Sequence, residues 1–134
     1  MKGYIVKKIT TFIFAVVTCS GVFADLYKAE FVAPGSFGGP NTNFSFVVDL
    51  NFTDSGSISG EIKNFYGAKH CPWNGVQLSG SNLANGNFRW SSDENINKGC
   101  GKLVFVGKKE GAKLVGYLPR FQGIKVDLEL EPTN

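Results

Sequence analysis

Hydrophobic and polar residues alternate along two stretches of this chain, residues 43–52 and 124–131. Successive side chains of a β-strand point to opposite faces, so alternation predicts a strand with one apolar face. In the first stretch, the alternating apolar residues are Phe44, Phe46, Val48, Leu50 and Phe52. A turn over residues 53–56 and a second strand over 57–66, carrying Ile58 and Ile62, complete a predicted β-hairpin.

The rest of the chain repeats this pattern in shorter segments separated by turn residues. Further strands are predicted over 26–33, 76–81, 87–91, 101–107 and 112–118, and Asn85-Gly86 is a hairpin turn signal. The polar stretch 91–99 is predicted to be a loop with a helical turn at most. Gly60 and Gly116, inside predicted strands, are expected at kinks or bulges.

About eight strands joined by short turns most simply form an all-β antiparallel meander. Such a sheet must hide its apolar face and its two edges. A small closed barrel does both, so it is favoured over a two-sheet sandwich. This fold requires the strand near Leu26 to pair with the strand near Leu130.

Residues 1–24 are predicted to be a signal peptide rather than part of the fold. Three lysines precede the apolar run 9–17, and Ala24 precedes the expected cleavage site. Two alternatives are an N-terminal membrane anchor and a lipoprotein acylated on Cys19. The prediction places one domain over 25–134, without a transmembrane segment, in a secreted or periplasmic protein.

Removal of the signal peptide changes the charge of the chain. The full sequence has 14 Lys and Arg against 11 Asp and Glu, and three of the lysines lie in residues 1–24. The remaining domain is formally neutral and has no basic stripe in its sequence. This excludes electrostatic support for binding to nucleic acid or to an anionic membrane.

Two cysteines remain after residue 24, and we predict that Cys71 and Cys100 form a disulfide. A metal site or redox pair is the alternative, but the chain has no CxxC motif and a single histidine, His70. No nucleophile motif, calcium loop or phosphate-binding loop is present. We therefore expect neither an enzyme nor a cofactor or metal.

Aromatic residues gather around Cys71, and they provide the candidate binding site: Tyr66, His70 and Trp73. Tyr and Trp are enriched at recognition surfaces. For Trp73, packing in the core and surface contact are equally supported, whereas the parity of Trp90 with Phe88 favours the core. The predicted function is binding of an unidentified protein or surface ligand, in an inhibitor-like or envelope-associated role.

Two alternative functions remain open at this point. The barrel is either a carrier of a small apolar ligand or a purely structural envelope module. The sequons at Asn43 and Asn51 lie on the polar parity of one strand, and the sequence leaves their use, the partner and the oligomeric state open.

Overall fold

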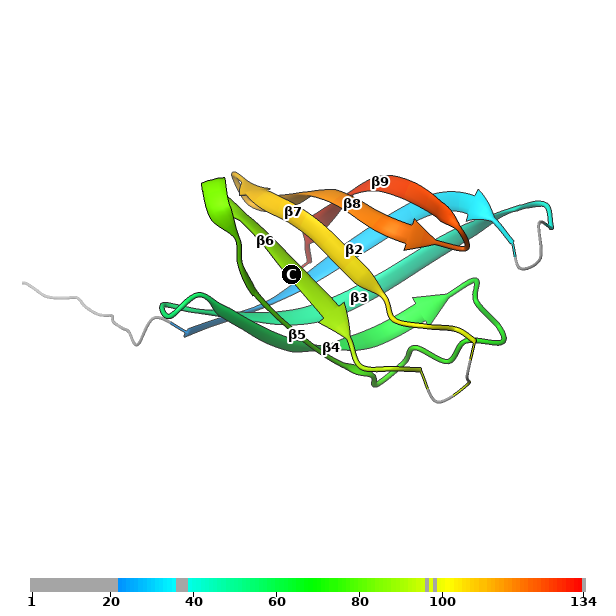
Figure 1. Cartoon of the computed structure of the whole chain (residues 1–134), viewed down its shortest axis with the longest axis horizontal. Coiled ribbons are helices and arrows are strands. Elements are labelled where there is room, and N and C mark those ends of the chain that lie inside the picture. The colour runs from blue at the N-terminus through cyan, green and yellow to red at the C-terminus, as the bar shows by residue number, and fades with distance from the viewer. Residues whose placement is uncertain (1–21, 36–38, 96, 98, 134) are drawn as a thin grey trace, which may run out of the picture.

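The computed structural model describes residues 22–35, 39–95, 97 and 99–133, and it is an eight-stranded antiparallel barrel (Figure 1). Each strand pairs with the next in the chain, as a meander requires. The strands are β2 (Val22–Pro34), β3 (Asn41–Thr53), β4 (Ser57–Tyr66), β5 (Gln77–Asn82), β6 (Asn87–Ser92), β7 (Val104–Glu110), β8 (Lys113–Phe121) and β9 (Ile124–Pro132).

The barrel closes through a short ladder between β2 and β9. Tyr27 pairs with Pro132 and Lys28 with Glu131, and the backbone N–H of Thr133 donates to the carbonyl oxygen of Leu26 at 2.9 Å. Both edges of the sheet are thereby covered. The structure confirms the closed barrel over the two-sheet sandwich.

The predicted turns form where the sequence places Gly or Asn. Gly56 has φ 89°, in the turn between β3 and β4. Asn85 and Gly86 both have positive φ, of 63° and 78°, within a 3₁₀ turn over Ala84–Gly86 that joins β5 to β6. Positive φ at two successive residues is what an Asn-Gly hairpin turn needs.

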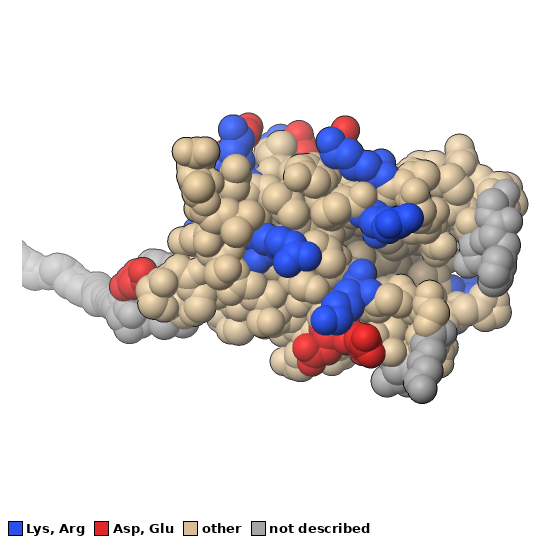
Figure 2. Space-filling model, viewed as in Figure 1, with Lys and Arg blue, Asp and Glu red and all other residues tan. Residues whose placement is uncertain are grey.

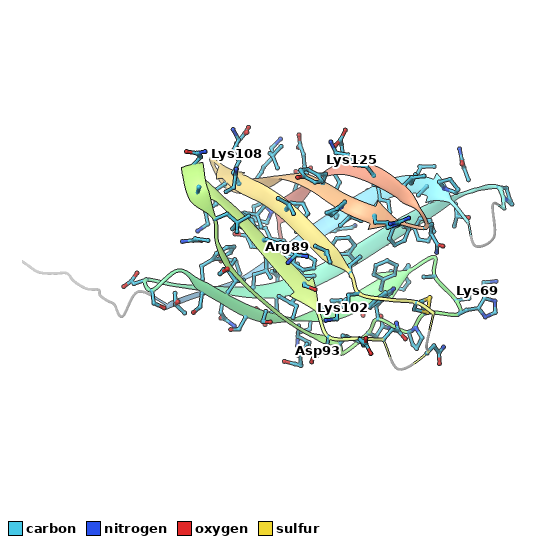
Figure 3. The ribbon with its side chains drawn as sticks, in the orientation of Figure 1. Lys69, Arg89, Asp93, Lys102, Lys108 and Lys125 are labelled. Atoms are coloured by element: carbon cyan, nitrogen blue, oxygen red, sulfur yellow. A yellow bond between two sulfur atoms is a disulfide. The ribbon has the colours of Figure 1, made fainter. Side chains whose placement is uncertain are left out.

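Inward apolar side chains fill the barrel, and aromatic rings are among them (Figure 3). Trp90, Phe46 and Phe105 are among the largest fully buried side chains. Trp90 stacks on Phe105 with 5.7 Å between ring centroids and meets Phe46 edge-on at 6.5 Å. The core position predicted for Trp90 is confirmed.

Two differences from the sequence-based expectations concern the bounds of strands. Strand β2 begins at Val22, three residues before the predicted start of the domain. Strand β6 extends to Ser92, into the stretch 91–99 that was predicted to be a loop, and the remaining described residues of that stretch agree with the prediction. The rest of the predicted signal peptide lies outside the described residues. So does Phe37, which the sequence predicts to be either a loop anchor in the core or an exposed contact.

Gly60 and Gly116 allow close approach between strands, and neither lies at a register shift. A Cβ on Gly60 would overlap the carbonyl oxygen of Asp49, and one on Gly116 would overlap that of Val106. The register shifts between Val47 and Val48 on β3, and again within the β8–β9 pair. The expected bulges therefore exist, but at other positions.

Gly60→Ala is predicted to destabilise the barrel, because its new methyl group must push β3 away from β4. Overpacking of this kind costs about 1–3 kcal/mol. Urea unfolding measures the change, with Ser59→Ala, at the exposed neighbouring position, as the control. Equal stability of the two variants would contradict this role of Gly60.

Tyr27 makes the stability of the barrel sensitive to alkaline pH. Burial, and secondarily the charge of Asp25 and a hydrogen bond to it, raise the pKa of Tyr27 above its ordinary value of 10.0. The unfolded chain ionises first, so the stabilisation by protonated Tyr27 is complete below about pH 10 and is lost as the pH rises through the folded-state pKa. Tyr27→Phe should make the melting temperature fall less steeply above pH 10.

Candidate binding site at the disulfide end of the barrel

Four connections of the meander lie at one end of the barrel, those after β2, β4, β6 and β8 (Figure 1). Cys71 lies in the connection after β4 and Cys100 in the one after β6. The two residues form a disulfide, with their Cα atoms 5.7 Å apart. The structure confirms the predicted bond, and we call this end of the molecule the disulfide end.

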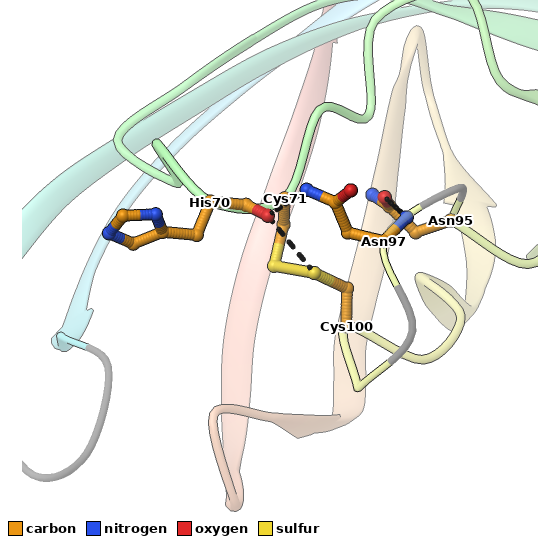
Figure 4. The surroundings of a disulfide bond; sticks show 5 residues. All are labelled: His70, Cys71, Asn95, Asn97 and Cys100. Carbon is orange, nitrogen blue, oxygen red and sulfur yellow. Dashed lines mark hydrogen bonds between the residues drawn. A yellow bond between two sulfur atoms is a disulfide. The ribbon is translucent and has the colours of Figure 1, made fainter.

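Hydrogen bonds hold the two connections together beside the disulfide (Figure 4). The side-chain amide of Asn97 donates to the carbonyl oxygen of His70 at 2.6 Å, across 27 residues of sequence. The same oxygen lies 3.4 Å from Cys100 Sγ, which is a close contact because a disulfide sulfur carries no proton. The backbone of His70 is therefore fixed.

The connection after β4 folds back along that strand and completes its hydrogen bonding. The backbone N–H of Gly75 donates to the carbonyl oxygen of Ile62 at 2.7 Å, and the N–H of Ile62 donates to that of Val76 at 2.9 Å. The Asn74 side chain accepts a 2.6 Å bond from the N–H of Phe65. This disulfide-pinned loop, residues 67–76, is thus attached to β4 through its last three residues.

Trp73 lies in the core, so its side chain is not available as a surface contact. Its exposed fraction is 3%, and its ring centroid lies 6.3 Å from that of Phe65. Of the two interpretations that the sequence supported equally, the structure favours packing. The physical reason is the fold-back of the loop, which turns the indole toward the open end of the aromatic core.

Tyr66 and His70 remain on the surface. Tyr66 is 62% exposed and ends β4, where its partner in register is Ser45 of β3. His70 is exposed at the tip of the disulfide-pinned loop. The structure therefore presents two of the three predicted binding residues to solvent, with the third beneath them.

A surface hollow of about 430 Å³ is lined by residues of β2 and β3. Its lining includes Ser45, the register partner of Tyr66, and Val32, which is 58% exposed. Val32 was not among the predicted site residues. The sequence does indicate that Val32 points outward, because it alternates with the inward residue Phe31. It does not give the register of β2, β3 and β4, which places Val32 on the same outer surface as Tyr66.

The described residues were compared with the requirements of a metal centre and of a cysteine nucleophile. They contain no group of three or more His, Cys, Asp and Glu side chains able to hold a metal ion. The oxidised cysteines have no free thiolate, which is the nucleophilic form of cysteine. What the disulfide end offers is a fixed backbone, two exposed rings and an adjoining hollow.

Comparisons with protein-family models, with curated proteins and with solved structures each gave no significant match. In the part of the chain that the structure describes, no helix is long and apolar enough to cross a membrane. The function of the disulfide end must therefore be argued from its geometry.

Trp73→Ala is predicted to lower the free energy of unfolding by about 3–5 kcal/mol, the usual cost of truncating a buried Trp. The variant removes an indole that packs on Phe65 and supports the disulfide-pinned loop. Thermal melting of the oxidised protein measures the loss, and His70→Ala, at an exposed position of the same loop, is the control. A Trp73→Ala protein that melts with the parent would contradict the core position.

Proposed function

We propose that this protein acts by binding, and that Tyr66 and His70 at the disulfide end contact a protein or surface partner. The observation that carries the proposal is the exposure of Tyr66 beside a loop whose backbone is fixed by a disulfide and by strand-like hydrogen bonds. Trp73 acts indirectly, as the support of that loop.

A fixed loop loses little conformational freedom on binding, and this lowers the free-energy cost of association. An exposed Tyr offers a large apolar area with a polar tip, which is why Tyr is frequent among residues that dominate binding energy. The hollow lined by Val32 and by Ser45, the register partner of Tyr66, supplies a concave surface for a side chain of the partner.

The compartment belongs to the same proposal. A disulfide is compatible with an oxidising, extracellular or periplasmic location. The basic and apolar pattern of residues 1–24 supports export by a cleaved signal peptide. The role proposed is therefore that of a secreted or periplasmic recognition protein, inhibitor-like or attached to the cell envelope.

The packing of the barrel argues against the alternative of an apolar ligand carrier. A carrier needs inward space, but here rings meet rings along the axis, as where Phe46 stacks on Phe65 at 5.6 Å. Two hollows on the surface both include the charged residue Glu30 in their lining. A purely structural module remains the alternative, and it requires no contact at Tyr66.

Tyr66→Ala should weaken partner binding strongly while leaving the melting temperature close to that of the parent. An aromatic residue that dominates an interface typically costs about 2 kcal/mol or more of binding when truncated, roughly a thirtyfold loss of affinity. A photo-crosslinking amino acid at position 66 would identify the partner in cells, and the loss is then measured on the purified pair by calorimetry.

Leu83→Ala is the matched control for this experiment. Leu83 is also an exposed apolar residue, at 46%, but it lies in the β5–β6 connection at the opposite end of the barrel. The proposal requires that Leu83→Ala binds normally. A partner that binds Tyr66→Ala as well as the parent, or the absence of any crosslink at position 66, would favour the structural module.

A further inference from the structure

The closed barrel divides into two halves of opposite charge, although the domain as a whole is formally neutral. The described part of 67–123, which contains β5–β8, carries seven Lys and Arg against three Asp and Glu. Residues 22–66 and 124–133, which form β2–β4 and β9, carry three against eight. Because β9 pairs with β2, each half is a continuous wall. Figure 2 shows the basic half facing the viewer.

A row of outward residues crosses the basic half at mid-strand. Arg89 on β6 pairs in register with Val106 on β7, and Val106 with Tyr117 on β8. Lys125 lies over the Tyr117 ring, with Nζ 4.6 Å from its centroid. Arg89 has no salt bridge among the described residues. Its side chain is exposed, and Figure 3 shows it on the side of the barrel that faces the viewer. We call Arg89, Val106 and Tyr117 the basic row.

The apolar part of this surface extends beyond the basic row. Val104 points outward from β7, as Val106 does, and Val115 points outward from β8, as Tyr117 does. Both valines are half-buried, so part of each side chain is in contact with solvent. Outward positions of a solvated barrel are ordinarily polar. A strip of valines and a tyrosine, bordered by Arg89 and Lys125, has the composition of a contact surface with a charged edge.

A second row of outward residues crosses the acidic half. Leu26 on β2 pairs with Asp49 on β3, and Asp49 pairs with Glu61 on β4. Leu26 is 40% exposed. Like charges directly opposite each other on neighbouring strands are destabilising. Lys63 reaches Glu61 at 3.6 Å, but Asp49 has no salt bridge within the described part of the chain. Within this acidic row, Glu61 therefore has a cation beside it and Asp49 has none among the described residues.

We propose that the partner of the basic row is the acidic row of a second copy of this chain. The apolar residues Val106 and Tyr117 would cover Leu26, while Arg89 would approach the carboxylates of Asp49 and Glu61, which a guanidinium group binds well. The complementary surface is present on the molecule itself, in charge and in apolar character. This contact is independent of the proposed binding site at the disulfide end.

The position of the two rows determines the kind of assembly. The acidic row is centred on β3 and the basic row on β7, which lie four strands apart in a ring of eight. The rows therefore lie on opposite sides of the barrel. A contact between two different surfaces is heterologous, and opposed surfaces extend into an open line of copies rather than closing a dimer.

Analytical ultracentrifugation of the purified protein, with its disulfide formed, tests this assembly. At about 0.01 M salt, where the Debye length is about 30 Å, the average mass should rise steadily with protein concentration. At about 1 M salt, where it is about 3 Å, the increase should be strongly reduced. A protein that stays a single copy at every concentration and salt overturns the proposal.

Two double variants show which surfaces meet. One carries Arg89→Gln and Lys125→Gln, and the other carries Asp49→Asn and Glu61→Gln. Each alone should remain a single copy. Mixed, they should form a 1:1 pair and nothing larger, because only one intact basic row and one intact acidic row are then available. Asp54→Asn, in the β3–β4 turn, is the control that should assemble like the parent.

The melting temperature of each variant separates loss of contact from loss of folding. Asp49→Asn with Glu61→Gln removes a like-charge pair, so this variant should melt at or above the parent temperature while it assembles less. Association that survives in both double variants, or a mixture that forms no pair, contradicts contact between the two rows and overturns the proposal.

Discussion

Ring-to-ring packing along the barrel axis is the interaction on which the other features depend. An eight-stranded barrel has an interior just wide enough for side chains to fill it. Here Phe31 meets Phe121 edge-on at 5.1 Å, and Phe46 stacks on Phe65 at 5.6 Å, so rings from β2, β3, β4 and β8 close the space near the disulfide end. The indole of Trp73 packs on the same group through Phe65, and this contact links the disulfide-pinned loop to the core. Loss of this packing would therefore affect both the strands and the loop.

Large rings can occupy this interior because glycines lie beside them, on the same strand or on a neighbouring one. Gly80 pairs with Trp90, and a Cβ there would overlap the backbone of β6. A Cβ on Gly107 would lie 2.7 Å from the ring of Phe105. The packing has a cost, since the indole N–H of Trp90 is buried without a hydrogen-bond partner among the described residues. An unsatisfied donor costs about 1–3 kcal/mol, and the stacking of Trp90 on Phe105 offsets part of that cost.

The sequence predicts the strands and the barrel because their signals lie within short segments or follow from the number of strands and cysteines. Alternation over 43–52 specifies a strand without any tertiary information, Asn85-Gly86 specifies a turn, and two cysteines allow a single pairing. The position of Trp73 was not predictable in this way, because it depends on a loop that folds back through bonds between Gly75 and Ile62. The placement of Val32 and Tyr66 on one outer surface depends on register across three strands. The two charged halves depend on strand order around a closed ring, and a net charge summed over the whole chain conceals them.

The disulfide acts on stability and on the loop that holds the proposed binding site, whereas the basic and acidic rows act on assembly. In the chain-entropy model, closing a loop of about 30 residues stabilises the fold by roughly 3.6 kcal/mol through the unfolded state. In the folded state the same bond fixes the backbone around His70, far along the barrel axis from the mid-strand rows on β3 and β7. Copies that associate through these rows would leave the disulfide end of each barrel uncovered. An assembly of this kind would present several Tyr66 sites together, and weak individual contacts to a repetitive partner would then be strengthened by avidity.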